Sequence, residues 1–448
     1  MNRSERRPWT LLALGAALAL AFPVGMILGA CDTEELLEAE TPGRVAEEDL
    51  NDPALAETLA QSVVGDVECA WDRYVGAAAH HSDEWMQSSG NSTMKRWGLR
   101  DIPSTFDNYA TGTCDGGGYG LFTPMHVARV QAQENFGLIQ GFDDADVPDK
   151  TALLAMIRAY GAFTFIAFGE GFCGTPLDGE ETILGTAELL QRAETWFSEA
   201  IQLAQDAGET DLMNMALVGR ARARLGLEDY AGAIDDADDV PPGFRFDATR
   251  DVSPQRRQNS HYDNINGTAE ESEAEKHATI APSYRDVEWK GVDDPRVNVE
   301  WDGTLGFDFT TPHWRHDKIN SLSDPVMMAS YREAQMIIAE ASAMTGDLDT
   351  ARQILDDFHT AAGIPAVVEA DIPTQDDVIA HVIEERRREF LSEGGHRLRD
   401  HLRWRGTQFQ VPFLGEAGSD HPDGVDQNGQ PYEDTTCFPV PDVERGAG

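Results

Sequence analysis

The chain has 448 residues, and its 79 Asp and Glu against 35 Lys and Arg give a net charge of −44 at pH 7. So acidic a surface argues against binding to nucleic acid or to anionic lipid headgroups, because both would repel it. The length suffices for a substantial core, and we expect one superhelix with inserted loops rather than separate domains.

The N-terminal segment has the features of an export signal. A basic start precedes the apolar run Leu11–Leu20, and residues 28–30 end in small side chains directly before Cys31. We predict a lipoprotein signal peptide at 1–30, cleaved before Cys31, which then carries lipid such as palmitate. An uncleaved signal anchor is the alternative. No later stretch is expected to supply the roughly 20 apolar residues of a spanning helix.

Helical periodicity begins after an acidic stretch. Residues 31–52 are predicted to be a flexible tether, and residues 53–448 a single domain. Further helices are predicted at 125–140, 150–168 and 186–205. The first predicted helix places these apolar side chains on one face: Leu55, Leu59, Val63, Val67 and Trp71.

Two long stretches interrupt the helices. The loop region 80–125 is polar and aromatic, and its His80-His81 pair is interpreted as helix-end surface rather than as metal ligands. The insertion 243–325 is too long for an ordinary loop, and its charged part 269–276 is predicted to be mobile. The acidic cluster at 143–146 lacks the Gly and Glu of an EF-hand and is interpreted as a solvated turn.

Two helical hairpins repeat one spacing, which predicts an all-α fold of tetratricopeptide-like helical pairs. The spacing is that of Ala221, Tyr230 and Ala233 in one hairpin and of Ala339, Leu348 and Ala351 in the other. Glycines 346 and 363 are expected to end the helices of the second pair. A third helix is predicted from Thr374, with Asp377 as capping-box partner, to Gly394-Gly395. Two unrelated amphipathic hairpins remain the alternative.

Four cysteines remain besides Cys31, an even number in an exported chain, which indicates disulfides. Of the three possible connectivities we favour Cys69–Cys114 and Cys173–Cys437. A metal site is the alternative, but no two of the four have C-x₂₋₄-C spacing. We therefore predict no metal and no cofactor.

No catalytic motif is found: the sequence lacks G-x-S-x-G, H-E-x-x-H and a Gly-rich phosphate loop, so we predict that the protein is not an enzyme. The charged residues of the third helix and its continuation are interpreted as structural ion pairs. These are Glu384, Glu385, Arg386, Glu389, Arg397, Asp400 and Arg403.

Several segments of the sequence resemble those of a known protein family. The strongest are YREAQMIIAEA, GDLDTARQILDDFHTAAG and VIEERRREFLSEGGHRLRDHLRW, followed by the closing Pro439-Val440-Pro441. Weaker ones are TPGRVAEEDLNDPALAETL, HSDEW and Asp294-Pro295-Arg296. In this order they resemble the SusD/RagB family of outer-membrane nutrient-binding lipoproteins, across nearly the whole mature chain.

The resemblance implies a lipid-anchored protein on the outer face of the outer membrane. Such a protein captures a nutrient, a glycan or also a peptide, without cleaving it. It passes the ligand to a SusC-like TonB-dependent transporter, against which the tetratricopeptide face is expected to dock. A tetratricopeptide-type envelope scaffold is the alternative function, and a surface hydrolase is a third that would require catalytic groups.

The resemblance also implies where a ligand binds, because the family builds its site from the loop region after the first helices and from the insertion. Aromatic rings stack on sugar faces there, and polar groups fix hydroxyls. No motif aligns the individual positions, and each tryptophan can instead be a plug that packs the insertion onto the scaffold. The implied ligand-binding residues are Trp85, Arg96, Trp97, Tyr284, Trp289, Trp301 and Trp314.

Overall fold

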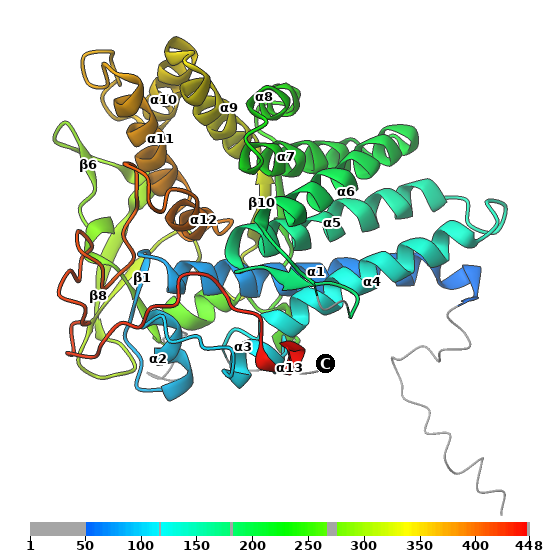
Figure 1. Ribbon diagram of the computed structural model, residues 1–448, viewed down its shortest axis with the longest axis horizontal. Helices are drawn as coiled ribbons and strands as arrows, with labels where there is room; N and C mark the ends of the chain where they lie inside the picture. Colours follow the sequence, from blue (N-terminus) through cyan, green and yellow to red (C-terminus); the bar gives the residue numbers. More distant parts are fainter. Residues whose placement is uncertain (1–50, 116–117, 180–181, 267–275, 446–448) are drawn as a thin grey trace, which may run out of the picture. The chain divides into compact units, whose positions relative to one another are not determined.

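The computed structural model describes residues 51–445, except 116–117, 180–181 and 267–275. The predicted signal peptide, Cys31, nearly all of the tether and most of the charged stretch 269–276 lie outside the described residues. From Asn51 onwards the chain forms one compact, mostly helical unit (Figure 1). The all-α prediction of helical pairs with long loop insertions is confirmed.

The longer helices are α1 (Ala56–His81), α4 (Phe122–Gly141), α5 (Lys150–Gly171), α6 (Thr186–Ala207), α7 (Thr210–Gly226), α8 (Tyr230–Asp238), α9 (Tyr331–Thr345), α10 (Leu348–Ala362), α11 (Gln375–Glu389) and α12 (His396–Arg403). Shorter ones are α2 (Ser92–Gly98), α3 (Asp107–Thr111) and α13 (Asp442–Arg445). Single helical turns of 3₁₀ or π type occur at Pro53–Leu55, Gln255–Arg257, Tyr262–Asn266, Pro282–Tyr284 and Pro295–Val297.

The tetratricopeptide-like pairs are α7–α8 and α9–α10, at the places that the repeated spacing predicts (Figure 1). Their alanines are fully buried where the helices cross, and a side chain this small lets the helix axes approach closely. Gly346 and Gly363 end α9 and α10 in the left-handed conformation, with φ of 89° and 71°. Only glycine adopts this conformation without a Cβ clash, so these two residues set the helix ends.

The third predicted helix, α11, begins as predicted but ends early. The Asp377 N–H donates to the Thr374 hydroxyl and the Thr374 N–H to the Asp377 carboxylate, at 3.2 and 3.0 Å, which completes the capping box. However, α11 ends at Glu389, before the predicted stop at Gly394-Gly395. Phe390 and the residue after it are buried in a turn that leads into α12, so burial of this turn ends the helix first.

The core of the unit is formed where α5 packs against α1, α4 and α6 (Figure 1). By length and composition α5 could cross a membrane, which corrects the expectation that no stretch after the signal is apolar enough. Yet 83% of its most apolar window is buried by the rest of the protein. Its apolar character therefore reflects burial on all sides by neighbouring helices.

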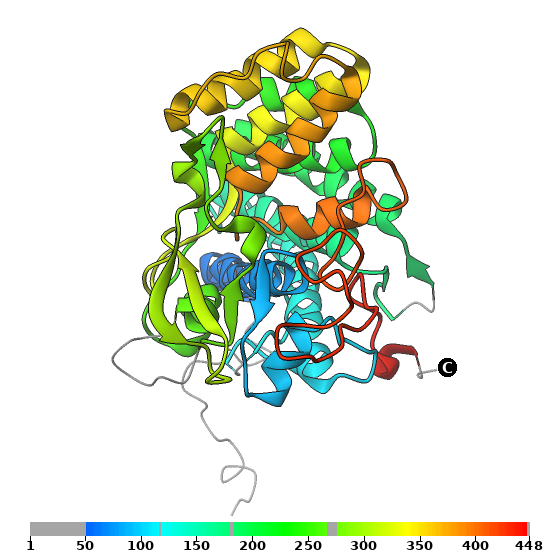
Figure 2. The same cartoon turned by 90° about the vertical axis from the view of Figure 1, so that its left-hand side faces the viewer.

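Short two-stranded sheets organise the loop regions. The antiparallel pairs are β1 (Trp85–Gln87) with β5 (Ala278–Ile280), β2 (Thr175–Pro176) with β3 (Ile183–Leu184), β4 (Arg245–Ala248) with β10 (Val326–Ser330), β6 (Glu288–Trp289) with β7 (Val292–Asp293), and β8 (Val299–Leu305) with β9 (Pro312–His316). The β1–β5 pair joins the loop region 80–125 to the insertion 243–325. Figure 2, which faces the left-hand side of Figure 1, shows β1, β6 and β8 on the same side of the molecule as the loops of the C-terminal segment.

Two disulfides fasten the loops to the helices, with the connectivity favoured from the sequence. Cys69 pairs with Cys114 and Cys173 with Cys437, and the Cα atoms lie 6.2 and 5.1 Å apart, within the usual range. Beside the second bridge, the Cys173 N–H donates to the Phe438 carbonyl oxygen at 3.0 Å. The C-terminal segment is thereby fixed to the end of α5.

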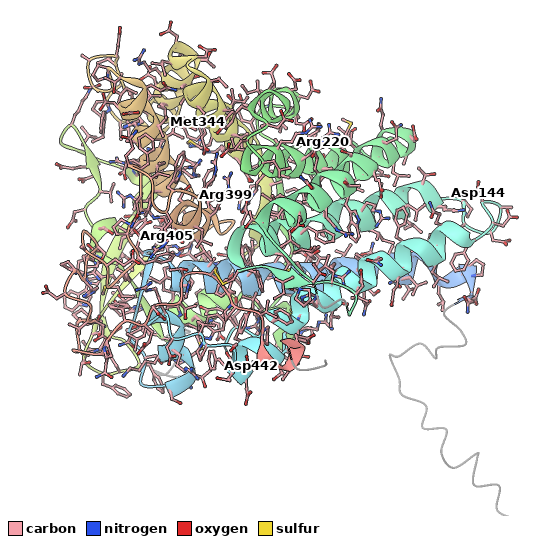
Figure 3. The ribbon with its side chains drawn as sticks, in the orientation of Figure 1. Asp144, Arg220, Met344, Arg399, Arg405 and Asp442 are labelled. Carbon is pink, nitrogen blue, oxygen red and sulfur yellow. A yellow bond between two sulfur atoms is a disulfide. The ribbon has the colours of Figure 1, made fainter. Side chains whose placement is uncertain are left out.

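The interpretation of His80-His81 as surface is wrong, because both side chains are fully buried at the end of α1. Tertiary packing covers them: the His80 ring lies 6.1 Å from that of Trp85, and the His81 ring 5.2 Å from that of Phe438. Burial disfavours the imidazolium and lowers the pKa of each to about 3. By contrast, the acidic turn at 143–146 is exposed at the tip between α4 and α5, where Figure 3 labels Asp144.

The interpretation of the charged C-terminal helices as a structural ion-pair network is confirmed. Arg386 on α11 pairs with Glu340 on α9 at 2.5 Å and with Asp400 on α12 at 2.7 Å, all buried. Arg403 reaches the same Glu340 from α12. These partners come from three helices rather than from one helix face. The network therefore fixes how the helices pack, and buried pairs of this kind are costly to break.

Candidate ligand-binding cleft

Three of the implied ligand-binding residues, Trp85, Trp97 and Tyr284, are fully buried. The Trp85 indole N–H donates to the Ser392 hydroxyl at 2.8 Å, and the Trp97 indole N–H to the Asn108 side-chain oxygen at 3.2 Å. They act as plugs between the loop region and the helices, which is the alternative left open for each tryptophan. In this structure none of the three offers a surface that a ligand can reach.

Arg96 and Trp289 are partly exposed and already have partners. Arg96 forms an ion pair with Asp101 at 2.8 Å, and its guanidinium lies 4.1 Å from the centre of the Phe106 ring. The Trp289 ring, on β6, packs against histidines of α10 and α11 rather than belonging to the β8–β9 hairpin. The seven implied residues are therefore not gathered into one site.

Trp301 and Trp314 lie opposite each other on the β8–β9 hairpin, as register partners. The Trp301 side chain is 56% exposed, whereas Trp314 is half-buried beneath the Arg285 guanidinium, 4.7 Å from its ring. Directly opposed residues project from the same face of an antiparallel pair. Trp301 is thus the implied residue that presents an exposed aromatic surface, on the β8–β9 hairpin.

A cleft of about 460 Å³ opens at the tip of the β8–β9 hairpin. Three segments distant in sequence form it: the end of β1 together with helix α2, the hairpin tip, and a C-terminal turn. Its lining residues are Gln87, Ser89, Gly90, Lys95, Phe307, Asp308, Phe309, Thr310, Asn428 and Gln430. This volume lies in the range typical of small-molecule sites.

Backbone contacts hold the hairpin tip against the end of β1. The Asp308 N–H donates to the Ser88 carbonyl oxygen at 2.8 Å, and the Phe307 N–H to that of Lys276 at 3.0 Å. A Cβ on Gly306 would lie 2.4 Å from the Ser88 Cβ, so only glycine permits this approach. The lip of the cleft is therefore preformed.

Two phenylalanines supply the apolar surface of the cleft. Phe309 is 63% exposed, with its ring centre 5.9 Å from that of the half-buried Phe307. The Phe307 ring in turn packs edge-on against His277 at 5.1 Å. An exposed ring that rests on an anchored ring is a rigid platform against which a ligand can lie flat.

The polar rim is held by hydrogen bonds of its own. The Asn428 amide donates to the Asp308 carboxylate at 2.9 Å, and the Thr311 hydroxyl donates to the same carboxylate at 2.6 Å. Partial burial opposes ionisation of Asp308, but these hydrogen bonds outweigh it and hold the pKa of Asp308 below its usual value. Asp308 is thus a fixed anion at neutral pH.

Lys95 adds a positive charge on the other side of the cleft. Its ammonium group donates to the Gln430 side-chain oxygen at 3.2 Å. An ammonium has three N–H donors, so Lys95 can hold Gln430 and also donate to a ligand. Rings, an anion, a cation and amides together suit a ligand with apolar faces and many hydroxyl or carbonyl groups. The Ser89 hydroxyl, which also lines the cleft, lies 2.8 Å from Nδ1 of His277.

A second cavity, of about 130 Å³, lies between α5, α6 and α12 near Arg399, which Figure 3 labels. It is smaller than ordinary ligand sites. The Arg399 guanidinium there already pairs with Glu170 at 3.1 Å, both buried. The cavity is therefore a gap within the ion-pair network rather than a competing site.

Phe307, Phe309 and Asn428 were not predicted from the sequence. The predicted aromatic residues were the tryptophans of the insertion, whereas the cleft is lined by phenylalanines at a hairpin tip. A usable signal was present: Phe307-Asp308-Phe309 follows closely spaced glycines, and Asp426-Gln427-Asn428-Gly429 has turn composition. Neither turn, taken by itself, indicates that the two turns lie next to each other in the fold.

Comparisons with known proteins agree with this architecture. Residues 328–437, which contain α9 to α12 and the turn that carries Asn428, match the sequence model of the SusD family. This segment of the chain is similar to the SusD family. No curated protein matches the sequence.

Solved structures share the fold of this SusD-like chain. A SusD superfamily protein from Bacteroides thetaiotaomicron VPI-5482 is 12% identical with a TM-score of 0.64, over 87% of this chain and 97% of that one. A laminarin binding SusD-like protein is 14% identical with a TM-score of 0.60, over 87% and 97%. The same values hold for surface glycan-binding protein A from Bacteroides thetaiotaomicron in complex with laminarihexaose. At such identities the likeness shows the fold.

Of the cleft residues in this SusD-like protein, only Asn428 and Gln430 lie within the matched segment 328–437. The matched segment forms the helical scaffold and one rim of the cleft. The aromatic platform and Lys95 come from the loop region and the insertion, where side chains are freer to differ because they do not hold the scaffold together.

Proposed function

We propose that this SusD-like protein binds a glycan at the cleft beneath the β8–β9 tip. The observation that carries the proposal is the Phe307–Phe309 platform beside a rim of fixed polar groups. Sugar rings have apolar C–H faces that pack on aromatic rings, while their hydroxyl groups need fixed donors and acceptors. Two solved proteins of the same fold are described as laminarin binding and as a complex with laminarihexaose, which supports this ligand class.

The proposed action is capture without cleavage. The polar groups of the rim are engaged with one another, which makes them suitable for orienting a ligand but not for proton transfer during hydrolysis. A ligand incubated with the pure protein is therefore expected to be recovered unchanged. Chromatography of the oligosaccharide after long incubation tests this expectation, and reproducible shortening of the chain would contradict it.

The ligand class is tested by screening the mature protein against an oligosaccharide array that includes laminarihexaose, followed by calorimetry on each positive ligand. We expect saturable binding to at least one glycan, with a 1:1 stoichiometry. A panel of short peptides serves as the comparison, because peptides are the other nutrient class. Binding to peptides and to no glycan would overturn the glycan assignment while keeping the cleft as a ligand site.

We propose in addition that Cys31 is lipidated and anchors the protein to the outer membrane, facing the exterior. The support is the sequence alone: small residues directly precede Cys31 after an apolar run. The variant Cys31→Ser is expected to appear in the soluble fraction or to remain unprocessed. Unchanged membrane retention of a processed variant would refute the anchor.

We propose that the captured ligand passes to a SusC-like TonB-dependent transporter, with the α7–α10 helical pairs as the docking face. Exposed helical faces of such repeats commonly serve as binding surfaces, and the family resemblance supports the choice of partner. Crosslinking of carboxylates in intact cells followed by mass spectrometry should link acidic side chains of these helices to an outer-membrane barrel. Links only to other envelope proteins would favour the scaffold function instead.

A further inference from the structure

Two histidines and a glutamate meet between α10 and α11, next to the β6–β7 hairpin (Figure 1). His359 lies near the end of α10, while His381 and Glu385 lie one turn apart on α11. One nitrogen from each ring and one carboxylate oxygen all fall within 4.8 Å of one another. All three side chains are buried. No metal site was predicted from the sequence, because neither the cysteine spacing, the His80-His81 pair nor the acidic cluster at 143–146 indicated one.

The hydrogen bond that His359 Nδ1 makes leaves the other ring nitrogen, Nε2, facing the Glu385 carboxylate. The Nδ1 atom lies 2.9 Å from the Pro365 carbonyl oxygen, which can only accept, so Nδ1 carries a proton and donates it. In the neutral ring, Nε2 then directs a lone pair at Glu385 Oε2, only 2.9 Å away. Two acceptors at this distance repel each other unless a proton or a cation lies between them.

The surroundings of His381 favour a cation over a proton between His359 Nε2 and Glu385 Oε2. Its Nε2 atom is buried without a hydrogen-bond partner, on a side chain that is 7% exposed, and lies 3.9 Å from the same Glu385 Oε2. A second proton on His359 would satisfy the contact with Glu385 but would leave His381 Nε2 unpaired. A cation shared by all three atoms satisfies both contacts. Arg296 pairs with the other carboxylate oxygen, Oε1, and so leaves Oε2 for the cation.

We propose that His359 Nε2, His381 Nε2 and Glu385 Oε2 bind a zinc ion. Two imidazoles and a carboxylate are a donor set that zinc prefers, with water completing the tetrahedron. Bonds of roughly 2.0–2.1 Å place tetrahedral ligands about 3.3 Å apart. The separations of 2.9 and 3.9 Å lie on either side of this value, so small rotations of the rings complete the site.

The surroundings fit such an ion. The hydrogen bond from His359 Nδ1 to Pro365 fixes the tautomer that frees Nε2, as outer-shell carbonyls do in zinc proteins. The Trp289 ring centre lies 5.2 Å from that of His359 and 5.0 Å from that of His381, which covers the position from solvent. The net charge of −44 also raises the local concentration of cations. The bound ion would tie α10 to α11 independently of the glycan cleft.

The test uses the mature protein with a purification tag that contains no histidine, treated with a chelator and then titrated with zinc in excess magnesium. We expect one zinc per chain and a higher melting temperature, reversed by chelator. The Trp289 indole beside the site gives a second signal, because bound cobalt(II) or copper(II) should quench its fluorescence. Trp289→Phe should remove that quenching and retain one equivalent of metal.

The decisive variant is His381→Gln, matched with His421→Gln in the partly exposed C-terminal loop as a control. Loss of a direct ligand should weaken zinc binding by about 100-fold or more, whereas the control should bind like wild type. Equal effects of both variants, or no stoichiometric metal on wild type, would overturn the proposal. If His381→Gln does not fold, cobalt(II) on wild type decides: intense visible bands support a tetrahedral site, and the weak bands of a six-coordinate ion refute it.

Discussion

Replacing Phe309 with alanine tests the proposed binding platform directly. The ring is 63% exposed, and its centre lies 5.9 Å from that of Phe307. An aromatic pair contributes about 0.5–1.5 kcal/mol, and so exposed a pair should fall at the low end. We therefore expect Phe309→Ala to lower the melting temperature by no more than about 2 °C.

The effect on ligand binding should be much larger. By analogy with bases stacked on aromatic side chains, the loss of one stacking ring costs about 1–3 kcal/mol of binding free energy. Since 1.4 kcal/mol corresponds to a factor of ten, Kd should rise by roughly 5- to 150-fold. Phe309→Tyr keeps the ring face and should bind within about threefold of wild type, because the ring that packs on the sugar is unchanged.

The assay is calorimetry with the best glycan from the array, alongside a thermal melt of each variant. Val252→Ala serves as the matched control, because Val252 is also an exposed apolar residue but does not line the cleft. An unchanged Kd for Phe309→Ala would show that the hairpin tip is not the platform. Weaker binding by the Val252→Ala control would show that the loss reflects general damage rather than a lost contact.

Two further predictions concern stability. Burial lowers the pKa of His81 to about 3, so between pH 6.5 and about 3 only the unfolded chain binds a proton at this residue. The free energy of unfolding should therefore fall as the pH falls through this range. In urea titrations, His81→Gln should reduce the slope of that free energy against pH by about 1.4 kcal/mol per pH unit. Arg222→Met should cost about 3–5 kcal/mol, because it leaves the buried Glu333 carboxylate without its arginine and Glu170 with Arg399 alone. Arg315→Met at an exposed pair should cost at most about 1 kcal/mol, and equal denaturation midpoints would contradict this difference.

The helical scaffold could be predicted because its signals are local. The capping box at Thr374, the left-handed glycines 346 and 363, and the repeated alanine spacing each depend on residues within one or two turns. The end of α11 could not be predicted in this way. Phe390 leaves the helix because the turn is buried by other elements, and the glycines expected to stop the helix instead lie at the start of α12.

The ligand site was harder to predict, because aromatic residues in loops serve two purposes that look alike in sequence. Trp85 and Trp301 both lie in polar surroundings along the chain, yet Trp85 is a buried plug and Trp301 is exposed on a hairpin. Which purpose applies depends on what packs against each ring. His80 and His81 were misread for the same reason, since the segments that cover them include Phe438, far away in sequence.

The sequence by itself determined the helices, their pairing into tetratricopeptide-like units and the structural character of the charged C-terminal helices, because periodicity, caps and charge act over short distances along the chain. Only the tertiary structure decided which rings face solvent and which distant side chains meet. Phe309 and Asn428 line one cleft, and His359 meets Glu385, because separate segments dock against the same scaffold. That docking depends on three-dimensional packing, which cannot be predicted from the spacing of residues along the chain.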